Sequence, residues 1–359
     1  MDQATAAKSK PHLTQLQAKE LAQRLYGRVV TDISNLPSYF DQNFLLVDED
    51  GTEFLLKVMN SADSRNPVLL EVQTDAMAFL QQWGLPAQTV LPTAEGQLMS
   101  LEEIDCGFGS QTYCVRLMTY LPGTTIARIP ASPQLLYHVG KMAATMDKML
   151  QQMASPNLGV LQRDEMMWSL SNTCLLEPYL PVMDGDPLQQ VIKAVMEQYK
   201  TCVQPKLSSF RKGIIHGDFS DQNIIVKPVD NGGYEVSGIL DFALLSINCV
   251  VFEVAISIMY MMLENPSPLD VGGAVLAGWE SVMPLSQAER DVLYLLMLCR
   301  FCQSLVIGRH KASKHPEDSE YYLTTAQSGT RLLKKLWELG KEEVERKWFQ
   351  DARAYAYKS

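Results

Sequence analysis

The sequence predicts a two-lobed α+β protein in which a small strand-rich lobe precedes a larger helical lobe. Length is the first observation, because 359 residues exceed the usual size of one domain. The second is order, since aliphatic runs of strand length fill residues 43–58 and 87–121 and longer helical patterns follow. The third is the Pro-Gly turn in "LPGTT", which we interpret as a hinge. We therefore expect lobes at 1–118 and 125–359, joined by a hinge at 119–124.

The small lobe is expected to begin with an amphipathic helix at residues 12–26 and a β-hairpin at 43–58. In the hairpin, two aliphatic runs flank Asp50-Gly51, a favoured two-residue turn. Lys57 lies near the end of the second strand. The pattern therefore puts a single cationic side chain at the end of a mostly apolar strand.

A helix is then predicted between Asn66 and Gly84. Asn66 can cap its start, Pro67 suits its first turn, and Gly84 is a typical residue just past a helix end. Its apolar residues recur on one face, and Glu71 lies beside that face. We expect this glutamate to be available to the lysine of the preceding strand.

The larger lobe is expected to open with a helix from Ser132 to about Met149. Residues 244–263 approach the length of a membrane span, but Asn248 and Glu253 near the middle favour a buried helix of a soluble core. The amphipathic stretch 330–349 predicts a solvated surface helix.

Composition excludes several classes of function. A net charge of −10 argues against binding to the phosphate backbone of nucleic acid. The seven cysteines are odd in number, and the first ten residues are polar, so we expect reduced thiols in a cytoplasmic protein without a membrane segment. The pair Cys299 and Cys302 lies in an apolar helical pattern, which favours buried structural thiols over a metal site. No obligate protein partner is indicated.

Polar residues cluster in "GIIHGDFSDQNIIVKP", residues 213–228, between two aliphatic runs. The loop contains His216, Asp218, Asp221 and Asn223. Aspartate and asparagine in a loop are usually turn formers, so this stretch alone leaves that interpretation open. A second predicted strand nearby ends in Asp241, however, which adds a carboxylate at another strand end.

Phosphoryl transfer requires this set of side chains. Nucleotide phosphates need a cation, metal ions need oxygen ligands, and the acceptor hydroxyl needs a carboxylate that takes its proton. The chain supplies a strand lysine, a helix glutamate, a loop aspartate and asparagine, and a strand-end aspartate, namely Lys57, Glu71, Asp218, Asn223 and Asp241. Their order predicts a phosphoryl-transfer enzyme.

The segment "HGDFSDQN" resembles the H-G-D-x-x-x-x-N loop of the aminoglycoside-phosphotransferase-like small-molecule kinases, and "ILDF" is similar to their metal-binding strand end. The resemblance implies a protein-kinase-like fold, with Asp218 as the catalytic base and Asn223 and Asp241 as ligands of Mg²⁺. It also implies nucleotide binding by the strand lysine, its helix partner and the hinge backbone, namely Lys57, Glu71, Thr119, Tyr120 and Leu121. The segment "SYFDQN" at 38–43 corresponds to the phosphate-covering turn of that family.

Segments such as "LPSYFDQNF" and "VGGAVLAGWESV" are similar to family members that phosphorylate 5-hydroxy-L-lysine. This resemblance implies that amino alcohol as the acceptor and GTP as the donor, although no residue pattern separates guanine from adenine. The acceptor's ammonium and carboxylate groups call for partners of opposite charge. Asp221 is a candidate for an ammonium group, and Arg300 for the carboxylate, with a structural ion pair as the alternative for Arg300.

Two alternatives stay open. The acceptor is another amino alcohol, or the protein is a catalytically impaired nucleotide-binding scaffold. The second is favoured by Ala243 and Leu244, which follow "LDF" where family members commonly have glycine and an acidic residue. We interpret His216 as a residue that braces the loop, and Glu253 either as an acceptor for loop N–H groups or as half of a buried ion pair.

Overall fold

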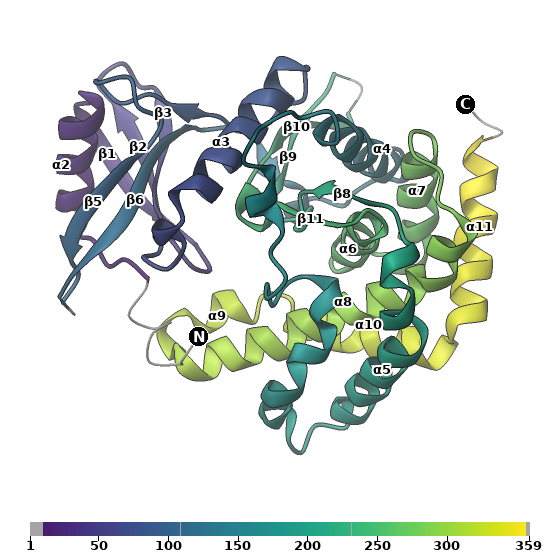
Figure 1. The fold of residues 1–359 in the computed structure, drawn as a ribbon. Coiled ribbons are helices and arrows are strands. Elements are labelled where there is room, and N and C mark those ends of the chain that lie inside the picture. Colours follow the sequence, from purple (N-terminus) through teal and green to yellow (C-terminus); the bar gives the residue numbers. More distant parts are fainter. Residues whose placement is uncertain (1–9, 108, 231, 357–359) are drawn as a thin grey trace. The chain divides into compact units, whose positions relative to one another are not determined.

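The computed structural model describes residues 10–107, 109–230 and 232–356. The chain divides into two compact units (Figure 1). The N-terminal unit comprises residues up to Pro122 together with Ser155–Val160, and the C-terminal unit comprises Gly123–Ala154 and the residues from Leu161 onward. A sheet dominates the first unit and helices the second, which confirms the predicted α+β class. The division falls inside the expected hinge at 119–124.

The N-terminal unit contains a six-stranded antiparallel sheet. Its strand order is β1 (Val30–Leu36), β2 (Gln42–Asp48), β3 (Glu53–Val58), β6 (Ser110–Thr119) and β4 (Val90–Leu91), with β5 (Ser100–Asp105) also paired to β6. The predicted hairpin is confirmed as β2 and β3, and its register pairs Asn43 with Lys57.

Two helices accompany this sheet, α2 (Gln15–Tyr26) and α3 (Pro67–Gln82). Helix α2 begins after Thr14, whose hydroxyl accepts the N–H of Gln17 in a capping box. Apolar residues of α2 and of β2, β3 and β6 form one buried core that includes Phe44 and Leu56. Asn66 caps α3 as predicted.

The C-terminal unit has two small sheets. One orders β10 (Tyr234–Ile239), β9 (Ile224–Pro228) and β7 (Thr124–Thr125), and the other pairs β11 (Ser246–Cys249) with β8 (Lys212–Ile215). The helices are α4 (Pro133–Leu150), α5 (Leu188–Cys202), α6 (Val251–Met262), α7 (Pro268–Glu280), α8 (Gln287–Lys314), α9 (Ser319–Tyr322), α10 (Ala326–Leu339) and α11 (Lys341–Ala356). A 3₁₀ stretch covers Leu170–Met183.

Helix α6 is the centre of this unit, because every one of its residues is buried. It packs against α4, α7 and α8 (Figure 1). Helices α4 and α7 cross closely, since a Cβ atom on Gly140 would lie 1.9 Å from the carbonyl oxygen of Val275. A Cβ on Gly278 would lie equally close to the carbonyl oxygen of Tyr137. The glycines of α4 and α7 are therefore required by packing.

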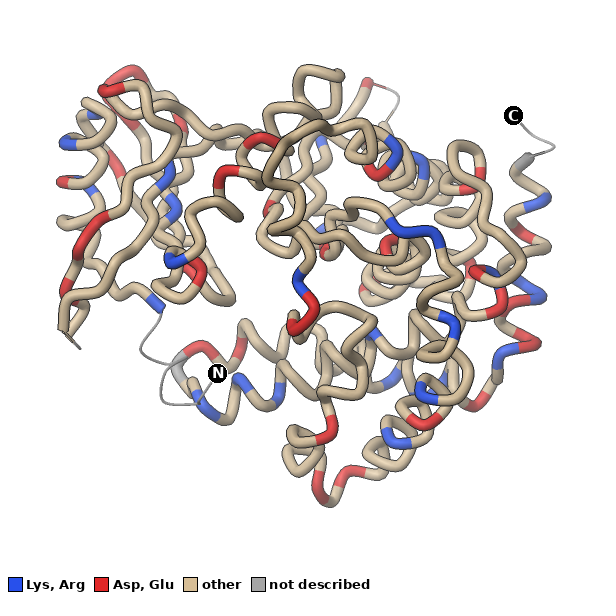
Figure 2. The backbone as a smooth tube through the Cα atoms, viewed as in Figure 1, with Lys and Arg blue, Asp and Glu red and all other residues tan. Residues whose placement is uncertain are grey.

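The C-terminal prediction of one surface helix at 330–349 is wrong in one respect. Gly340, at φ 77°, separates α10 from α11. Lys and Arg alternate with Asp and Glu along α11, as Figure 2 shows, yet Trp348 on that helix is fully buried. Both helices therefore cover the core as well as facing solvent.

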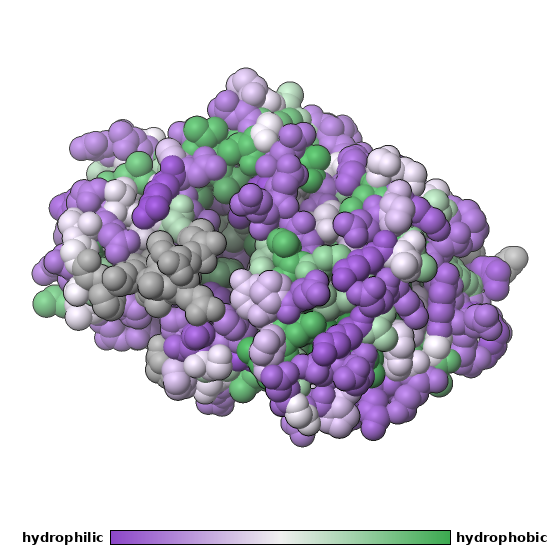
Figure 3. Space-filling view, turned by 60° about the horizontal axis from the view of Figure 1, so that its bottom comes forward, coloured by the Kyte–Doolittle hydropathy of each residue, from purple (hydrophilic) through white to green (hydrophobic). Residues whose placement is uncertain are grey.

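Helix α8 is, among the described residues, the one helix long and apolar enough to cross a membrane by length and composition. Within its most apolar window, 94% is buried inside the protein. Cys299 and Cys302 lie on this helix as buried free thiols, as expected. The face seen in Figure 3 is mostly hydrophilic, with hydrophobic side chains in small groups.

Candidate active site

The predicted polar residues lie next to the ends of three strands, β8, β9 and β10. Strand β8 ends at Ile215 and β9 begins at Ile224, so the whole motif lies in one loop. Strand β10 pairs with β9, with Ile239 opposite Ile224, and the N–H of Leu240 donates to the carbonyl oxygen of Asn223 at 2.9 Å. Asn223 and Asp241 therefore flank the same end of this hairpin.

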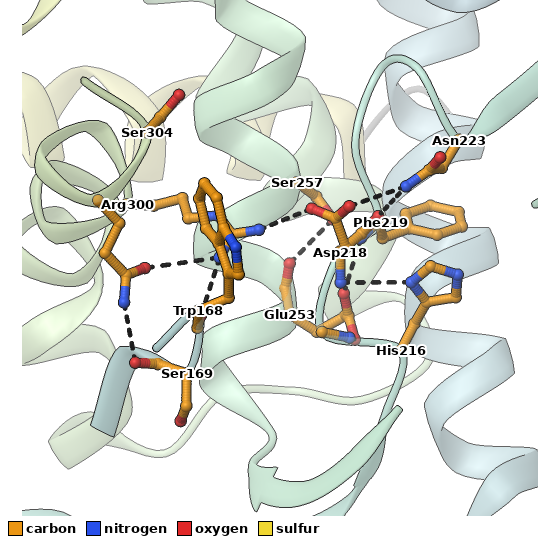
Figure 4. Close-up of polar contacts among 12 residues, drawn as sticks. Trp168, Ser169, His216, Asp218, Phe219, Asn223, Glu253, Ser257, Arg300 and Ser304 are labelled. Carbon is orange, nitrogen blue, oxygen red and sulfur yellow. Dashed lines mark hydrogen bonds and ion pairs between the residues drawn. The ribbon is translucent and has the colours of Figure 1, made fainter. Parts of the chain in front are cut away.

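Asp218 lies in this loop and is held by two side chains (Figure 4). The amide nitrogen of Asn223 donates to its Oδ2 at 2.9 Å and to its backbone oxygen at 3.0 Å. Nη2 of Arg300 lies 2.6 Å from its Oδ1. The side chain of Asp218 is still 25% exposed. Burial raises the pKa of the carboxyl above its ordinary value, and the charge of Arg300 opposes the rise.

His216 braces the loop, as expected. Its Nδ1 accepts the N–H of Asp218 at 3.3 Å, so its Nε2 must carry the proton that is donated to the carbonyl oxygen of Leu240 at 2.9 Å. The ring is fully buried and joins the Asp218 loop to the strand end before Asp241. Gly217 has φ 79°, and a Cβ there would lie 2.7 Å from the carbonyl oxygen of Leu244.

Glu253, on α6, accepts the N–H groups of Gly217 at 2.9 Å and Phe219 at 3.4 Å (Figure 4). This confirms the first of the two interpretations of Glu253. Asp147, on α4, is also fully buried, and neither of its oxygens has a hydrogen-bond partner among the described residues. Burial, and then the charge of Glu253, raises the pKa of Asp147 well above its ordinary value.

Arg300 does not lie where a substrate could meet it, so its predicted role as a carboxylate clamp is not supported. Its side chain is fully buried, and its Nη1 donates to the carbonyl oxygen of Trp168 at 2.8 Å. The guanidinium carbon lies 4.8 Å from the Trp168 ring centre and 5.3 Å from that of Tyr260. The alternative, a structural ion pair, is what the structure contains, and its partner is Asp218.

Asp221 is 6% exposed, and its Oδ1 has no hydrogen-bond partner among the described residues. Burial, and then the negative charge of Asp218, raises its pKa to about 7. Its backbone oxygen accepts the N–H of Ala127 at 3.2 Å, which fixes the loop against the segment after β7. A buried carboxylate oxygen without a partner is costly, so a cationic ligand is the natural partner for this side chain.

Asp241 has φ 56° and is the one non-glycine residue with positive φ in the described part of the chain. Such strain persists at functional sites when the surroundings impose it. Its Oδ1 accepts the N–H of Ala243 at 3.3 Å. Because φ is not positive at Ala243, alanine in place of the family's glycine brings no backbone strain.

The oxygen donors here fit Mg²⁺. The hydrogen bonds of Asn223 to Asp218 use its amide nitrogen, so its amide oxygen is the atom suited to a metal, beside the carboxylate of Asp241. Among the described residues, no group of three or more His, Cys, Asp or Glu could hold a metal by itself. Mg²⁺ commonly takes one or two protein oxygens and completes its shell with substrate phosphates and water.

Lys57, in the N-terminal unit, is buried and forms an ion pair of 3.1 Å with Asp41. Asp41 in turn accepts the backbone and side-chain N–H groups of Asn60. The expected partner Glu71 is exposed. Asp41, which lies in the "SYFDQN" segment, is thus a partner of Lys57 in the structure, and the orienting role of Glu71 stays a prediction.

The hinge prediction also changes in detail. The N–H of Thr119 donates to the carbonyl oxygen of Thr89 at 2.9 Å, and its own carbonyl oxygen accepts from the side chain of Gln88 at 2.9 Å. That N–H is therefore already used within the protein, and base contacts by Tyr120 and Leu121 stay a prediction.

Comparison with known proteins identifies the family. A sequence model of the phosphotransferase enzyme family matches residues 32–285. The chain belongs to this family. It is 58% identical to a hydroxylysine kinase of Danio rerio, with 97% of this chain and 98% of the relative covered. It is 41% identical to a hydroxylysine kinase of Mus musculus, with 97% and 96% covered. These matches show that the protein is a phosphotransferase that acts on an alcohol group of a small molecule.

Solved structures show the same fold. The amicoumacin kinase hAmiN, in complex with AMP-PNP, Ca²⁺ and Ami, has a TM-score of 0.67 at 15% identity and covers 97% of this chain and 96% of its own. A microcompartment-associated aminopropanol kinase has a TM-score of 0.61 at 16% identity, with 90% and 98% covered. Similarity at this level of identity supports the protein-kinase-like, two-lobed α+β architecture of this phosphotransferase.

Sequence reasoning missed four side chains. Asp41 pairs with Lys57 in the N-terminal unit, and Asp147, Trp168 and Tyr260 lie near Glu253 or Arg300 in the C-terminal unit. Only Asp41 carried a signal, because it lies in a segment already assigned to the phosphate-covering turn. The positions of the others depend on tertiary packing, which no local pattern reveals.

Proposed function

We propose that this phosphotransferase transfers the γ-phosphoryl group of GTP to the side-chain hydroxyl of 5-hydroxy-L-lysine. The similarity to hydroxylysine kinases over nearly the whole chain supports the acceptor. The observation that carries the chemistry is the partly exposed Asp218 carboxylate, fixed from two sides by Asn223 and Arg300.

In this proposal Asp218 orients the acceptor hydroxyl and takes its proton. A carboxylate with a raised pKa is a better general base than an ordinary one, because its proton affinity is closer to that needed near neutral pH. The bonds from Asn223 and Arg300 hold Oδ2 and Oδ1 in fixed positions, so little reorganisation accompanies proton transfer.

Lys57 is proposed to bind nucleotide phosphates, with Asp41 holding its ammonium group in place. Tyr120 and Leu121 are proposed to meet the base through their backbone. Asn223 and Asp241 would hold Mg²⁺, which when bound neutralises charge on the phosphate oxygens. Glu71 and the N–H of Thr119 are not part of this proposal, for the reasons given above.

The test measures nucleoside diphosphate release from GTP and from ATP with 5-hydroxy-L-lysine and a panel of other amino alcohols. Release that depends on hydroxylysine, is faster with GTP, and is lost in Asp218→Asn supports the proposal. Stimulation by another amino alcohol but not by hydroxylysine would overturn the acceptor.

A catalytically impaired nucleotide-binding protein is the second possibility, favoured by Leu244 in place of an acidic residue. Mg²⁺-dependent binding of nucleotide without turnover on any amino alcohol would support it. The same panel therefore separates the two functions in one experiment.

A further inference from the structure

A small cavity lies beside the catalytic loop, within the C-terminal unit. The segment after β7 forms one wall through Ile126 and Ile129, and α6 forms the other through Tyr260. Asp221 and Glu264 supply its carboxylates. Its volume is about 10 Å³, which is about the room that one water molecule requires. An ammonium group is of similar size.

The charged residues that line this cavity are both acidic. Asp221 is 6% exposed, and its Oδ1 lacks a hydrogen-bond partner among the described residues. Glu264, which follows α6, is exposed and accepts a hydrogen bond from the hydroxyl of Ser328 at 3.0 Å. Neither Lys nor Arg is among the described residues that line the cavity. Two carboxylates without a lining cation attract a positively charged group.

Tyr260 links the cavity to the catalytic carboxylate. It lines the cavity, and its ring lies 5.3 Å from the guanidinium carbon of Arg300, which pairs with Asp218. Asp221 itself follows Asp218 by three residues, in the same segment between β8 and β9. A cation bound at Asp221 would therefore lie close to the hydroxyl that reacts.

We infer that Asp221, assisted by Glu264 at the exposed side, binds the ammonium group next to the reacting hydroxyl of the acceptor. The inference rests on the proposed function and specifies its substrate class, a vicinal amino alcohol. In 5-hydroxylysine the ε-ammonium is on the carbon adjacent to the carbinol, whereas the α-ammonium is three carbons away from it. Only the ε-ammonium reaches a carboxylate so near the base while the hydroxyl stays at Asp218.

Arg300 does not neutralise the cavity carboxylates. Its guanidinium is fully buried and used by Asp218 and the carbonyl oxygen of Trp168. The cavity carboxylates are thus left without a cation among the described residues that line the cavity. The walls formed by Ile126 and Ile129 suit the methylene that carries the ammonium group.

The experiment compares two ligands by isothermal titration calorimetry, 5-hydroxylysine and 2-amino-5-hydroxyhexanoic acid, in which hydrogen replaces the ε-ammonium group. Each is titrated into the wild-type protein, Asp221→Asn, Glu264→Gln and, as a matched control, Asp270→Asn. Asp270 is on α7, and its carboxylate pairs with Lys347 outside the cavity. Circular dichroism confirms that each variant is folded.

We expect the wild type to bind hydroxylysine about 10²-fold more tightly than the analogue, since a buried charge pair is formed with only one of them. In Asp221→Asn the two ligands should bind about equally. Glu264→Gln should lower the preference by roughly twofold to fivefold, because this carboxylate is exposed. The control should keep the wild-type preference.

A wild type that does not distinguish the two ligands, or does not bind hydroxylysine measurably, overturns the inference. So does an Asp221→Asn variant that keeps the full preference. Failure of the proposed function would look different. The wild type would prefer the ligand with the ε-ammonium group, Asp221→Asn would lose that preference, and yet the wild type would release no GDP. If Asp221→Asn kept a normal kcat/KM for hydroxylysine, the proposed function would stand, but the cavity would have no part in substrate binding.

Discussion

Nη2 of Arg300 lies 2.6 Å from Oδ1 of Asp218, and this ion pair joins the buried middle of helix α8 to the loop that carries the candidate base. A buried arginine is costly unless it is well paired, and two aromatic rings and a carbonyl oxygen complete its surroundings. Arg300 is therefore a positioning residue that acts through Asp218.

Asp218→Asn should lower kcat by about 10²- to 10⁴-fold, because the amide cannot take a proton but preserves the size of the side chain. Nucleotide binding and the thermal unfolding midpoint should change little. Steady-state kinetics beside nucleotide titration measure both. Near-normal turnover would remove Asp218 from the role of base.

Arg300→Lys should lower kcat by about 10- to 10²-fold while the KM for the acceptor changes little, because lysine cannot reach both Asp218 and the Trp168 carbonyl oxygen. Arg309→Lys, on the same helix and paired with Asp186, is the matched control. A rise confined to the acceptor KM would restore Arg300 as a substrate clamp.

Asp41→Asn should raise the KM for nucleotide by about tenfold and leave the acceptor KM unchanged, because the variant loses the charge that holds Lys57. The amide oxygen can still accept from Asn60, so the local fold should persist. Glu71→Gln should have no effect, since its side chain is exposed. The reverse order of effects would return the orienting role to Glu71.

Asp241→Asn should weaken Mg²⁺-dependent nucleotide binding by at least about tenfold, because a neutral amide is a poorer ligand for a hard cation. Asparagine tolerates positive φ, so the strained backbone at φ 56° should be retained. Nucleotide titrations with and without Mg²⁺ measure the difference. Equal loss in both conditions would indicate a structural effect of the substitution.

Asp147→Asn should flatten the pH dependence of stability. The pKa of Asp147 is raised in the folded state, so its contribution is fully present below the ordinary value of 3.8 and is lost as pH rises toward the raised value. The free energy of unfolding of the variant relative to wild type should therefore increase between about pH 5 and pH 8. Urea unfolding at both pH values measures it, with the exposed Asp75→Asn as control. An unchanged difference would contradict the raised pKa.

Local patterns in the sequence determined much of the fold. The Asp50-Gly51 turn and the cap at Asn66 depend on neighbours within a few residues, so their prediction needed no tertiary information. The candidate catalytic loop was predicted in the same way, because Asp218 and Asn223 lie in one short segment between β8 and β9.

Only the tertiary structure decided which side chains pair. Asp218 meets Arg300 across 82 residues of sequence, and Lys57 meets Asp41 rather than Glu71, because burial and strand register choose partners that spacing along the chain does not reveal. The Asp221 cavity likewise depends on α6 packing beside the segment after β7. The sequence by itself thus determined the kind of chemistry, whereas packing decided which charges are paired and which one is left for a ligand.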